Sequence, residues 1–169
     1  TEWGAVAYLA QSKYGKNSEV SINDNSSYYT GGGSGTSYRT NTAQSTTENT
    51  TGIYDMSGGA WEYVAGYVGN GGSYGSSLVN APARYKDTYS SYTAPTSGGH
   101  YGDAVWETSS SSSGSSSWYS DYSYFPDSGY FFERGGDCLD GSYAGLFYFD
   151  NVYGSAWDYS SFRVVVPVL

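Results

Sequence analysis

Cysteine, histidine and positive charge are scarce in this chain. Among its 169 residues there are one Cys, one His and 7 Lys and Arg against 16 Asp and Glu, so the net charge is −9. One cysteine excludes an internal disulfide. A surface this acidic repels phosphate groups, which argues against nucleic acid as a partner and against docking on an anionic membrane. No run approaches the roughly 18 apolar residues of a membrane helix, so we expect no direct membrane insertion by this segment.

Aliphatic side chains are also few, whereas aromatic rings make up 19% of the chain and include 21 Tyr. Rings must therefore supply much of the buried area. The 24 glycines and the many serines are typical of long irregular loops. The length fits one domain, which we place at residues 1–169. The chain begins at Thr1 without a methionine, so we expect an N-terminal anchoring or targeting segment to be absent from it.

Helical spacing predicts one helix at the start of the chain. Thr1 is its expected N-cap and Gly15 its C-terminal stop. The apolar face of this helix is expected to consist of Trp3, Val6, Ala7, Ala10 and Tyr14.

Two later segments have the pattern of strands. Residues 60–64 predict a strand with Trp61 and Tyr63 on one side. Residues 162–168 give the strongest strand signal, and their continuous valines predict a central, buried strand.

A display region, at about residues 131–161, precedes that last strand. We expect Gly135, Gly136, Gly145 and Phe162 to hold its frame, because glycines allow special backbone dihedrals and phenylalanine fills a core. The side chains between these positions are mostly polar or aromatic, and we expect them to face water and bind a ligand. They are Asp137, Cys138, Leu139, Asp140, Tyr143, Tyr148, Asp150, Asn151, Val152, Tyr153, Ser155, Trp157, Asp158 and Tyr159.

Four short motifs occur in a recognisable order. They are Glu2-Trp3, residues 52–63, Arg134-Gly135-Gly136 and Ser161-Phe162-Arg163. In order and spacing they resemble the formylglycine-generating-enzyme (sulfatase-modifying factor) branch of the C-type lectin fold. That resemblance implies an α+β chain with a small twisted antiparallel sheet, one or two helices and long irregular loops.

Residues 131–166 look more specifically like the variable proteins of diversity-generating retroelements. In that group the C-terminal end of a C-type lectin fold is diversified at template adenines, often in Asn or Tyr codons. Most of the expected display residues are types reachable from such codons. The N-terminal half also resembles the extracellular part of pilin-like surface proteins. These resemblances imply a location on a bacterial cell surface or a phage particle.

The resemblance also suggests two kinds of chemistry. Enzymes of this fold oxidise a cysteine with a pair of active-site cysteines, and a chain with Cys138 alone cannot form that pair. The family can hold a structural calcium ion, and the matching positions are Gly58, Ala60 and Glu62. The alternative for Glu62 is a bond to the backbone or to an arginine such as Arg163. For Arg134 we expect pairing with Glu133 or with a buried carbonyl.

These observations favour a non-enzymatic, surface-displayed binding module with no required cofactor. Tyr, Ser, Gly, Asn and Asp dominate the display region, as they dominate antibody combining loops. A macromolecular target is expected, and a protein is favoured over a glycan. One alternative is a carbohydrate-binding lectin that stacks sugars on the same rings. Another is a structural pilin or tail subunit in which the rings pack between subunits. A hydrolase that uses two of the aspartates is the most distant alternative.

Overall fold

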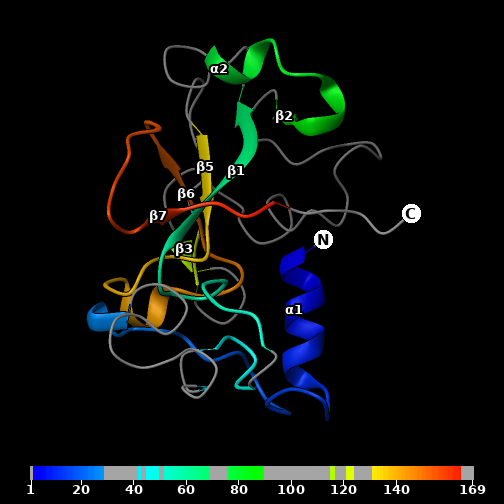
Figure 1. Cartoon of the computed structure of the whole chain (residues 1–169), viewed down its shortest axis with the longest axis vertical. Coiled ribbons are helices and arrows are strands. Elements are labelled where there is room, and N and C mark those ends of the chain that lie inside the picture. The colour runs from blue at the N-terminus through cyan, green and yellow to red at the C-terminus, as the bar shows by residue number, and fades with distance from the viewer. Residues whose placement is uncertain are drawn as a thin grey trace.

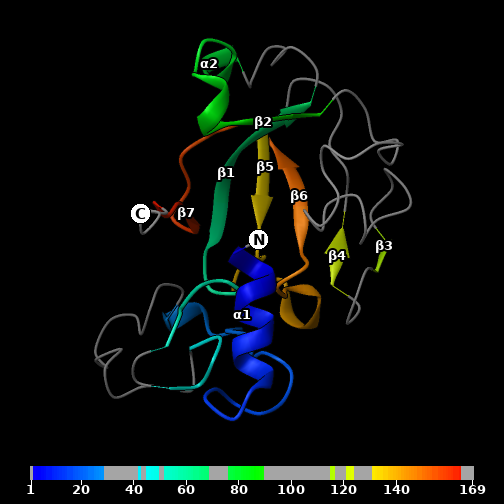
Figure 2. The same ribbon diagram turned by 90° about the vertical axis from the view of Figure 1, so that its right-hand side faces the viewer.

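The computed structural model describes residues 2–28, 42, 45–49, 52–68, 76–89, 115–116, 121–123 and 131–164. In this part of the chain a ten-residue helix lies beside an open, mixed sheet (Figures 1 and 2), so the protein has an α+β fold. In chain order the elements are α1 (Glu2–Gln11), η1 (Ser26–Tyr28), β1 (Trp61–Val68), α2 (Ser76–Val79), η3 (Ala83–Tyr85), β2 (Asp87–Tyr89), β3 (Ser115–Ser116), β4 (Tyr122–Ser123), β5 (Phe131–Arg134), η5 (Gly141–Tyr143), β6 (Phe149–Val152) and β7 (Ser160–Ser161).

Helix α1 confirms the predicted N-terminal helix and its apolar face. Val6 and Ala10 are buried, and Trp3 and Ala7 pack partly against the same cluster. The carboxylate of Glu2 lies in the first turn, where it interacts favourably with the helix dipole. The expected cap, Thr1, lies outside the described residues.

The predicted end of this helix is wrong, because α1 stops at Gln11 and does not reach Gly15. The hydroxyl of Ser12 donates to the carbonyl of Leu9 at 2.7 Å and accepts the amide hydrogen of Tyr14 at 3.2 Å. A serine that bonds to nearby backbone in this way competes with the helical hydrogen bonds. Tyr14 consequently lies beyond the helix and is exposed.

Strand β1 confirms the strand predicted at residues 60–64 and is an interior strand of the sheet, with β2 and β7 on one side and β5 on the other. The order is β2-β1-β5-β6-β4-β3, with β7 also beside β1. The expectation of an antiparallel sheet is wrong in part, since β1–β2, β1–β7 and β4–β6 are parallel pairs. Parallel neighbours need a long connection, and the connection from β1 to β2 contains α2 and η3.

The sheet has two distinct faces, defined by strand alternation and register. Tyr63, Glu133 and Asp150 lie opposite one another on β1, β5 and β6, so their side chains share one face. We call this the outer face, and it consists of Trp61, Tyr63, Phe131, Glu133, Asp150 and Val152. The inner face, which is turned toward α1, carries Glu62, Val64, Phe132, Arg134 and Phe149.

Two apolar clusters hold the described part of the chain together. On the inner face, Tyr89, Phe132 and Phe149 pack with Val64. A second cluster joins α1 to later loops and contains Val6, Met56, Leu146 and Phe147, with Trp3, Ala7, Val20 and Ile53 at its margin. Burying one such large side chain contributes about 1.5–3 kcal/mol. Rings therefore supply much of the described core, as the composition predicted.

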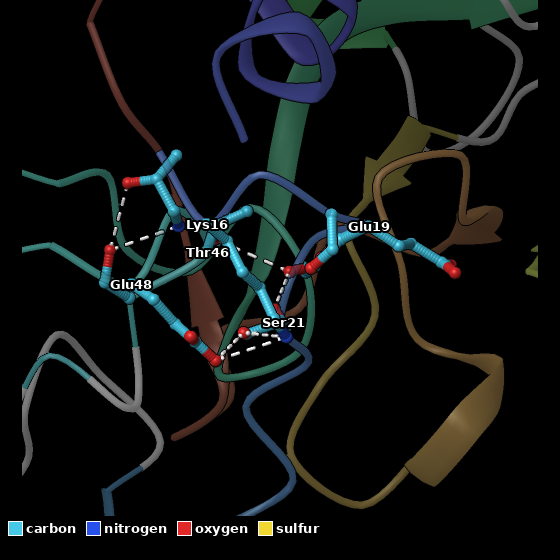
Figure 3. Close-up of polar contacts among 9 residues, drawn as sticks. Lys16, Glu19, Ser21, Thr46 and Glu48 are labelled. Carbon is cyan, nitrogen blue, oxygen red and sulfur yellow. Dashed lines mark hydrogen bonds and ion pairs between the residues drawn. The ribbon is translucent and has the colours of Figure 1, made fainter. Parts of the chain in front are cut away.

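The segment after α1 is fastened to residues 46–48 by polar contacts (Figure 3). The ammonium of Lys16 lies 3.2 Å from the Oε1 atom of Glu48 and donates to the hydroxyl of Ser21 at 2.9 Å. The Ser21 hydroxyl donates to Glu48, and the Ser21 amide donates to the carbonyl of Thr46 at 3.2 Å. These donors lower the pKa of Glu48. Partly exposed ion pairs of this kind contribute about 0–1 kcal/mol, so the network positions a loop and adds little stability.

The strand predicted at residues 162–168 is wrong for residues 162–164, the part of it that the structure describes. Strand β7 contains only two serines, and the Phe162 and Val164 side chains that follow are each 76% exposed. Polar contacts hold this segment instead: the hydroxyl of Ser161 donates to the carbonyl of Trp61 at 3.0 Å, and Arg163 pairs with Glu62. Phe162 therefore does not form part of the frame. Residues 165–169 lie outside the described residues.

Candidate functional site

The exposed members of the display region lie in two segments, the turn at residues 139–143 and the loop at residues 153–158. Most of the apolar and aromatic side chains in these segments are well exposed, Trp157 by 63%. Ser155 and Asp158 are exposed beside them. We call this set the recognition patch, and it consists of Leu139, Tyr143, Tyr153, Ser155, Trp157 and Asp158.

Trp61 on the outer face connects the two segments. Its ring stacks on the ring of Trp157, with centroids 5.8 Å apart and planes 7° apart. Its indole N–H donates to the Oδ2 atom of Asp140 at 3.0 Å. The turn and the loop therefore meet at one tryptophan, and the loop from β6 to β7 bulges on the side of the sheet away from α1 (Figure 1).

The loop is held to the sheet mainly by its own carbonyl groups. The hydroxyl of Tyr63 donates to the carbonyl of Ser155 at 2.9 Å, and the amide of Trp61 donates to the carbonyl of Tyr159 at 2.8 Å. The amide of Ser160 donates to the carbonyl of Trp157 at 3.1 Å. The backbone that carries the side chains of Trp157 and its neighbours is therefore anchored to the sheet.

Glycines allow the close approaches that shape this region. Gly154 has φ +81°, and a Cβ there would lie 2.7 Å from the ring of Phe131. Gly136 has φ +70°, and a Cβ there would lie 2.7 Å from the Cβ of Ala144. Gly135 also has a positive φ, and Gly145 lies directly against Asp121. The three glycines predicted as frame, Gly135, Gly136 and Gly145, all occupy positions where a larger residue would strain the chain.

The prediction that every display side chain faces water is wrong for Asp137, Cys138 and Tyr148, which are 3–4% exposed. Asp137 is buried because its Oδ1 atom accepts the amide hydrogens of Leu139 at 2.7 Å and Asp140 at 3.1 Å, which closes the turn. Burial raises the pKa of the Cys138 thiol, so this cysteine is poorly suited to act as a nucleophile. Burial likewise raises the pKa of the Tyr148 hydroxyl.

The remaining display residues are half-buried and form the margin of the patch. They are Asp140, Asp150, Val152 and Tyr159. The hydroxyl of Tyr148 contacts the Oδ2 atom of Asp150 at 3.5 Å. The backbone of Asn151 lies in β6 opposite Phe132, and its side chain lies outside what the structure describes.

The sequence analysis missed Glu133 as a site residue. Its side chain is 2% exposed, and its Oε2 atom has no hydrogen-bond partner. Burial, together with the negative charges of the nearby Asp150, Asp140 and Asp137, raises its pKa to about 9. The carboxyl of Glu133 is therefore protonated at neutral pH.

Glu133 was expected to be one of two partners for Arg134, and strand alternation excludes that pairing because the two side chains lie on opposite faces. The other alternative, a buried carbonyl, is confirmed: Arg134 donates to the carbonyl of Leu146 at 3.1 Å. Its guanidinium also lies over the ring of Trp3, at 5.0 Å from the centroid. If residues 131–134 had been predicted to form a strand, the alternation of side chains along it would have placed Glu133 and Arg134 on opposite faces of the sheet.

The predicted calcium residues are arranged around an ion pair. Glu62 is buried on the inner face, and both of its oxygens accept from Nε of Arg163, at 2.7 and 2.6 Å. Gly58 donates its amide hydrogen to the carbonyl of Gly135, and the Ala60 side chain is buried. The alternative expected for Glu62, a bond to Arg163, is therefore confirmed. Among the described residues no group of three or more His, Cys, Asp or Glu side chains is placed to hold a metal.

A cavity of about 520 Å³ opens on the inner face. Its lining includes the acidic residues Glu2, Glu62 and Asp87 and the basic residues Arg84, Lys86, Arg134 and Arg163. Arg163 is paired with Glu62, and Lys86 donates to the carbonyl groups of Leu78 and Val79. These cations thus serve contacts within the protein.

No helix in the described part of the chain has the length and apolar character needed to cross a membrane. Comparison with models of protein families, with curated proteins and with solved structures finds no match to this chain.

Proposed function

We propose that this chain is a non-enzymatic binding module whose recognition patch contacts a macromolecular target. The observation that carries the proposal is the Trp61–Trp157 stack. One face of the Trp157 ring rests on Trp61, and yet 63% of the residue is exposed to water. Large exposed rings on a fixed base give contact area at low entropic cost.

We also propose a C-type-lectin-like fold of the formylglycine-generating-enzyme branch. The support is that the four motifs which carried the resemblance contact one another in space. Trp3 lies under Arg134, and Glu62 pairs with Arg163. The amide of Gly58 donates to the carbonyl of Gly135 at 2.8 Å. Motifs more than a hundred residues apart in the chain therefore meet at the inner face.

Within that fold, the proposed class is the variable protein of a diversity-generating retroelement, displayed on a bacterial surface or a phage particle. Its support is that the patch side chains can change without loss of the contacts that hold their backbone. A direct check is genomic. We expect a nearby reverse-transcriptase gene and a near-copy of the coding segment for residues 131–166 that differs at template adenines.

The binding proposal is tested with an array of purified extracellular proteins. We expect the chain to bind at least one protein on the array. The substitutions Trp157→Ala and Tyr153→Ala should each abolish that binding. Tyr85→Ala is the matched control, because Tyr85 is an equally exposed ring on η3, outside the patch. Binding that survives both patch substitutions contradicts the proposal.

A glycan target is the second candidate, because an exposed ring beside the carboxylate of Asp158 also suits the stacking of a sugar. A glycan array separates this candidate from a protein target. Reading the array with and without a chelator also tests whether glycan binding requires calcium.

A structural pilin or tail subunit requires association of subunits through the patch, and a measurement of the mass in solution tests for that association. A stable monomer contradicts it.

A further inference from the structure

Trp61 contacts both segments that carry the recognition patch and belongs to neither of them. It is the first residue of β1, where it is paired with Ser160 of β7. Its amide donates to the carbonyl of Tyr159 at 2.8 Å, and its carbonyl accepts the hydroxyl hydrogen of Ser161 at 3.0 Å. The indole ring of Trp61 is therefore carried by a backbone that the sheet holds in place.

Asp140 forms the contact between Trp61 and the turn. Its Oδ2 atom accepts the indole hydrogen of Trp61 at 3.0 Å and the amide hydrogen of Asp137 at 2.8 Å. Its own amide donates to the Oδ1 atom of Asp137 at 3.1 Å, and its carbonyl accepts the amide hydrogen of Tyr143 at 3.2 Å. The carboxylate that receives Trp61 thus belongs to the hydrogen bonds that shape the turn.

Trp157 forms the contact between Trp61 and the loop. The two rings are stacked, with centroids 5.8 Å apart and planes 7° apart, within the range of distances that aromatic pairs favour. The carbonyl of Trp157 accepts the amide hydrogen of Ser160 at 3.1 Å. Since 63% of Trp157 is exposed, the stack contributes to the orientation of a side chain that water largely surrounds.

We infer that Trp61 is a positioning residue that couples the turn at residues 139–143 to the loop at residues 153–158, so that the side chain at position 140 affects the orientation of Trp157. The N–H edge of one rigid ring holds the turn and its face holds the loop. Asp140 therefore influences which target is bound without having to touch it. This inference rests on the proposed function and adds that the patch acts as one binding unit.

A substitution in the turn should move the Trp157 ring, and circular dichroism detects that movement. Two stacked indoles give a pair of ultraviolet bands of opposite sign, and the loss of these bands in Trp157→Phe assigns them to the stack. Asp140→Leu removes the acceptor of the Trp61 hydrogen bond and should abolish most of the band pair. Asp140→Asn keeps an oxygen that accepts this bond and should preserve the bands. Leu139→Ala is the matched control, because Leu139 is exposed in the same turn, and it should preserve them too.

Asp140→Leu also removes the acceptor of the Asp137 amide, so a second measurement separates damage to the turn from coupling. Hydrogen exchange of the Ser160 amide, which donates to the carbonyl of Trp157, reports local opening of the loop. We expect Asp140→Leu to speed this exchange about fivefold or more. In Trp61→Phe, which keeps a ring and lacks the indole donor, Asp140→Leu should have no further effect on it.

Coupling between two segments acts in both directions. Trp157→Ala should therefore speed the exchange of the Tyr143 amide, which donates to the carbonyl of Asp140 in the turn. Trp157 is exposed, so its substitution is compatible with folding, and this measurement decides the inference if Asp140→Leu does not fold.

An unchanged band pair in folded Asp140→Leu overturns the inference, as does an equal loss of the bands in Leu139→Ala. An effect of Asp140→Leu on the Ser160 amide that persists in Trp61→Phe overturns it as well, and so does an unchanged Tyr143 amide in Trp157→Ala. None of these measurements uses a target, so their failure leaves the proposed function standing. Target binding that survives the patch substitutions contradicts the proposed function and is scored separately, on the protein array.

Discussion

The guanidinium of Arg163 pairs with the carboxylate of Glu62, which lies 101 residues earlier in the chain. Arg163 also donates to the carbonyl of Tyr54 at 2.7 Å, so one side chain joins β1, the C-terminal segment and the loop before β1. Glu62 is 1% exposed. Burial raises the pKa of its carboxyl, and Arg163 opposes that rise. The ion pair is the main fastening of a segment that buries little apolar surface of its own.

Removal of this arginine should therefore destabilise the fold. We expect Arg163→Met to lower the free energy of unfolding by about 2–3 kcal/mol, because it leaves a buried carboxylate without its partner. Urea denaturation measures the change. Arg84→Met is the control, since Arg84 is exposed, and its loss should change stability by less than about 0.5 kcal/mol. Equal stability of the two variants would show that the pair is dispensable.

Two glycine substitutions should act in opposite directions. A Cβ at Gly145 would lie 2.0 Å from the Oδ1 atom of Asp121, whose carboxylate accepts the amide of Phe147. Gly145→Ala should cost about 1–3 kcal/mol through overpacking. Gly4 lies inside α1 with no atom near its missing Cβ, so Gly4→Ala should gain about 0.5–1 kcal/mol. Thermal denaturation of the two variants compares them, and a stabilising Gly145→Ala would contradict the packing described.

Stability should fall as the pH rises from weakly acidic to alkaline. The pKa of Glu133 is raised from 4.5 to about 9, and that of Asp121 from 3.8 to about 6. The folded state therefore holds protons that the unfolded state has lost, and this stability is complete at low pH and disappears as each folded-state pKa is passed.

Glu133→Gln isolates the contribution of that carboxyl. The variant should match the wild type at about pH 5 and exceed its stability at about pH 8, because the slope it removes is at most about 1.4 kcal/mol per pH unit. Urea denaturation at a series of pH values gives the slopes. Asp24→Asn, at an exposed position, should leave the wild-type slope in place. A wild-type profile that rises toward pH 8 would contradict the buried, protonated state of Glu133.

Cys138 should be unreactive in the folded protein. Its side chain is 3% exposed, and burial raises the pKa of its thiol. A disulfide reagent should modify it slowly in native buffer and rapidly in denaturant, because the thiolate is the reactive form. The ratio of the two rates is the measurement, with free cysteine as the reference for intrinsic reactivity. Rapid native modification would place Cys138 on the surface after all.

Local pattern was sufficient for some elements and insufficient for others. The spacing of Val6 and Ala10 predicted the core face of α1, and the placement of Trp61 and Tyr63 on one side predicted β1. Phe162 and Val164 were wrongly assigned to a strand, because the pairing of the preceding residues with β1 ends at Ser161 and the two side chains that follow are exposed.

The exposure of the display side chains was predicted correctly for one part of that region and wrongly for another. The side chains around Trp157 are exposed as predicted, and Gly154 before them has a positive φ. The burial of Asp137 and Tyr148 depends on which residues the folded chain brings over them, which no local pattern records. The burial of Glu133 on the outer face could also not be predicted locally, because it depends on how β1, β5 and β6 pair.

The loop between β6 and β7 is tied to the sheet through the carbonyl groups of residues 155, 157 and 159. Every amino acid supplies the same carbonyl, so the codons of residues 155, 157 and 159 can be randomised while these anchoring hydrogen bonds are kept. The chain thus offers a starting point for libraries of engineered binders, in which selection explores chemistry at the surface on an unchanged backbone.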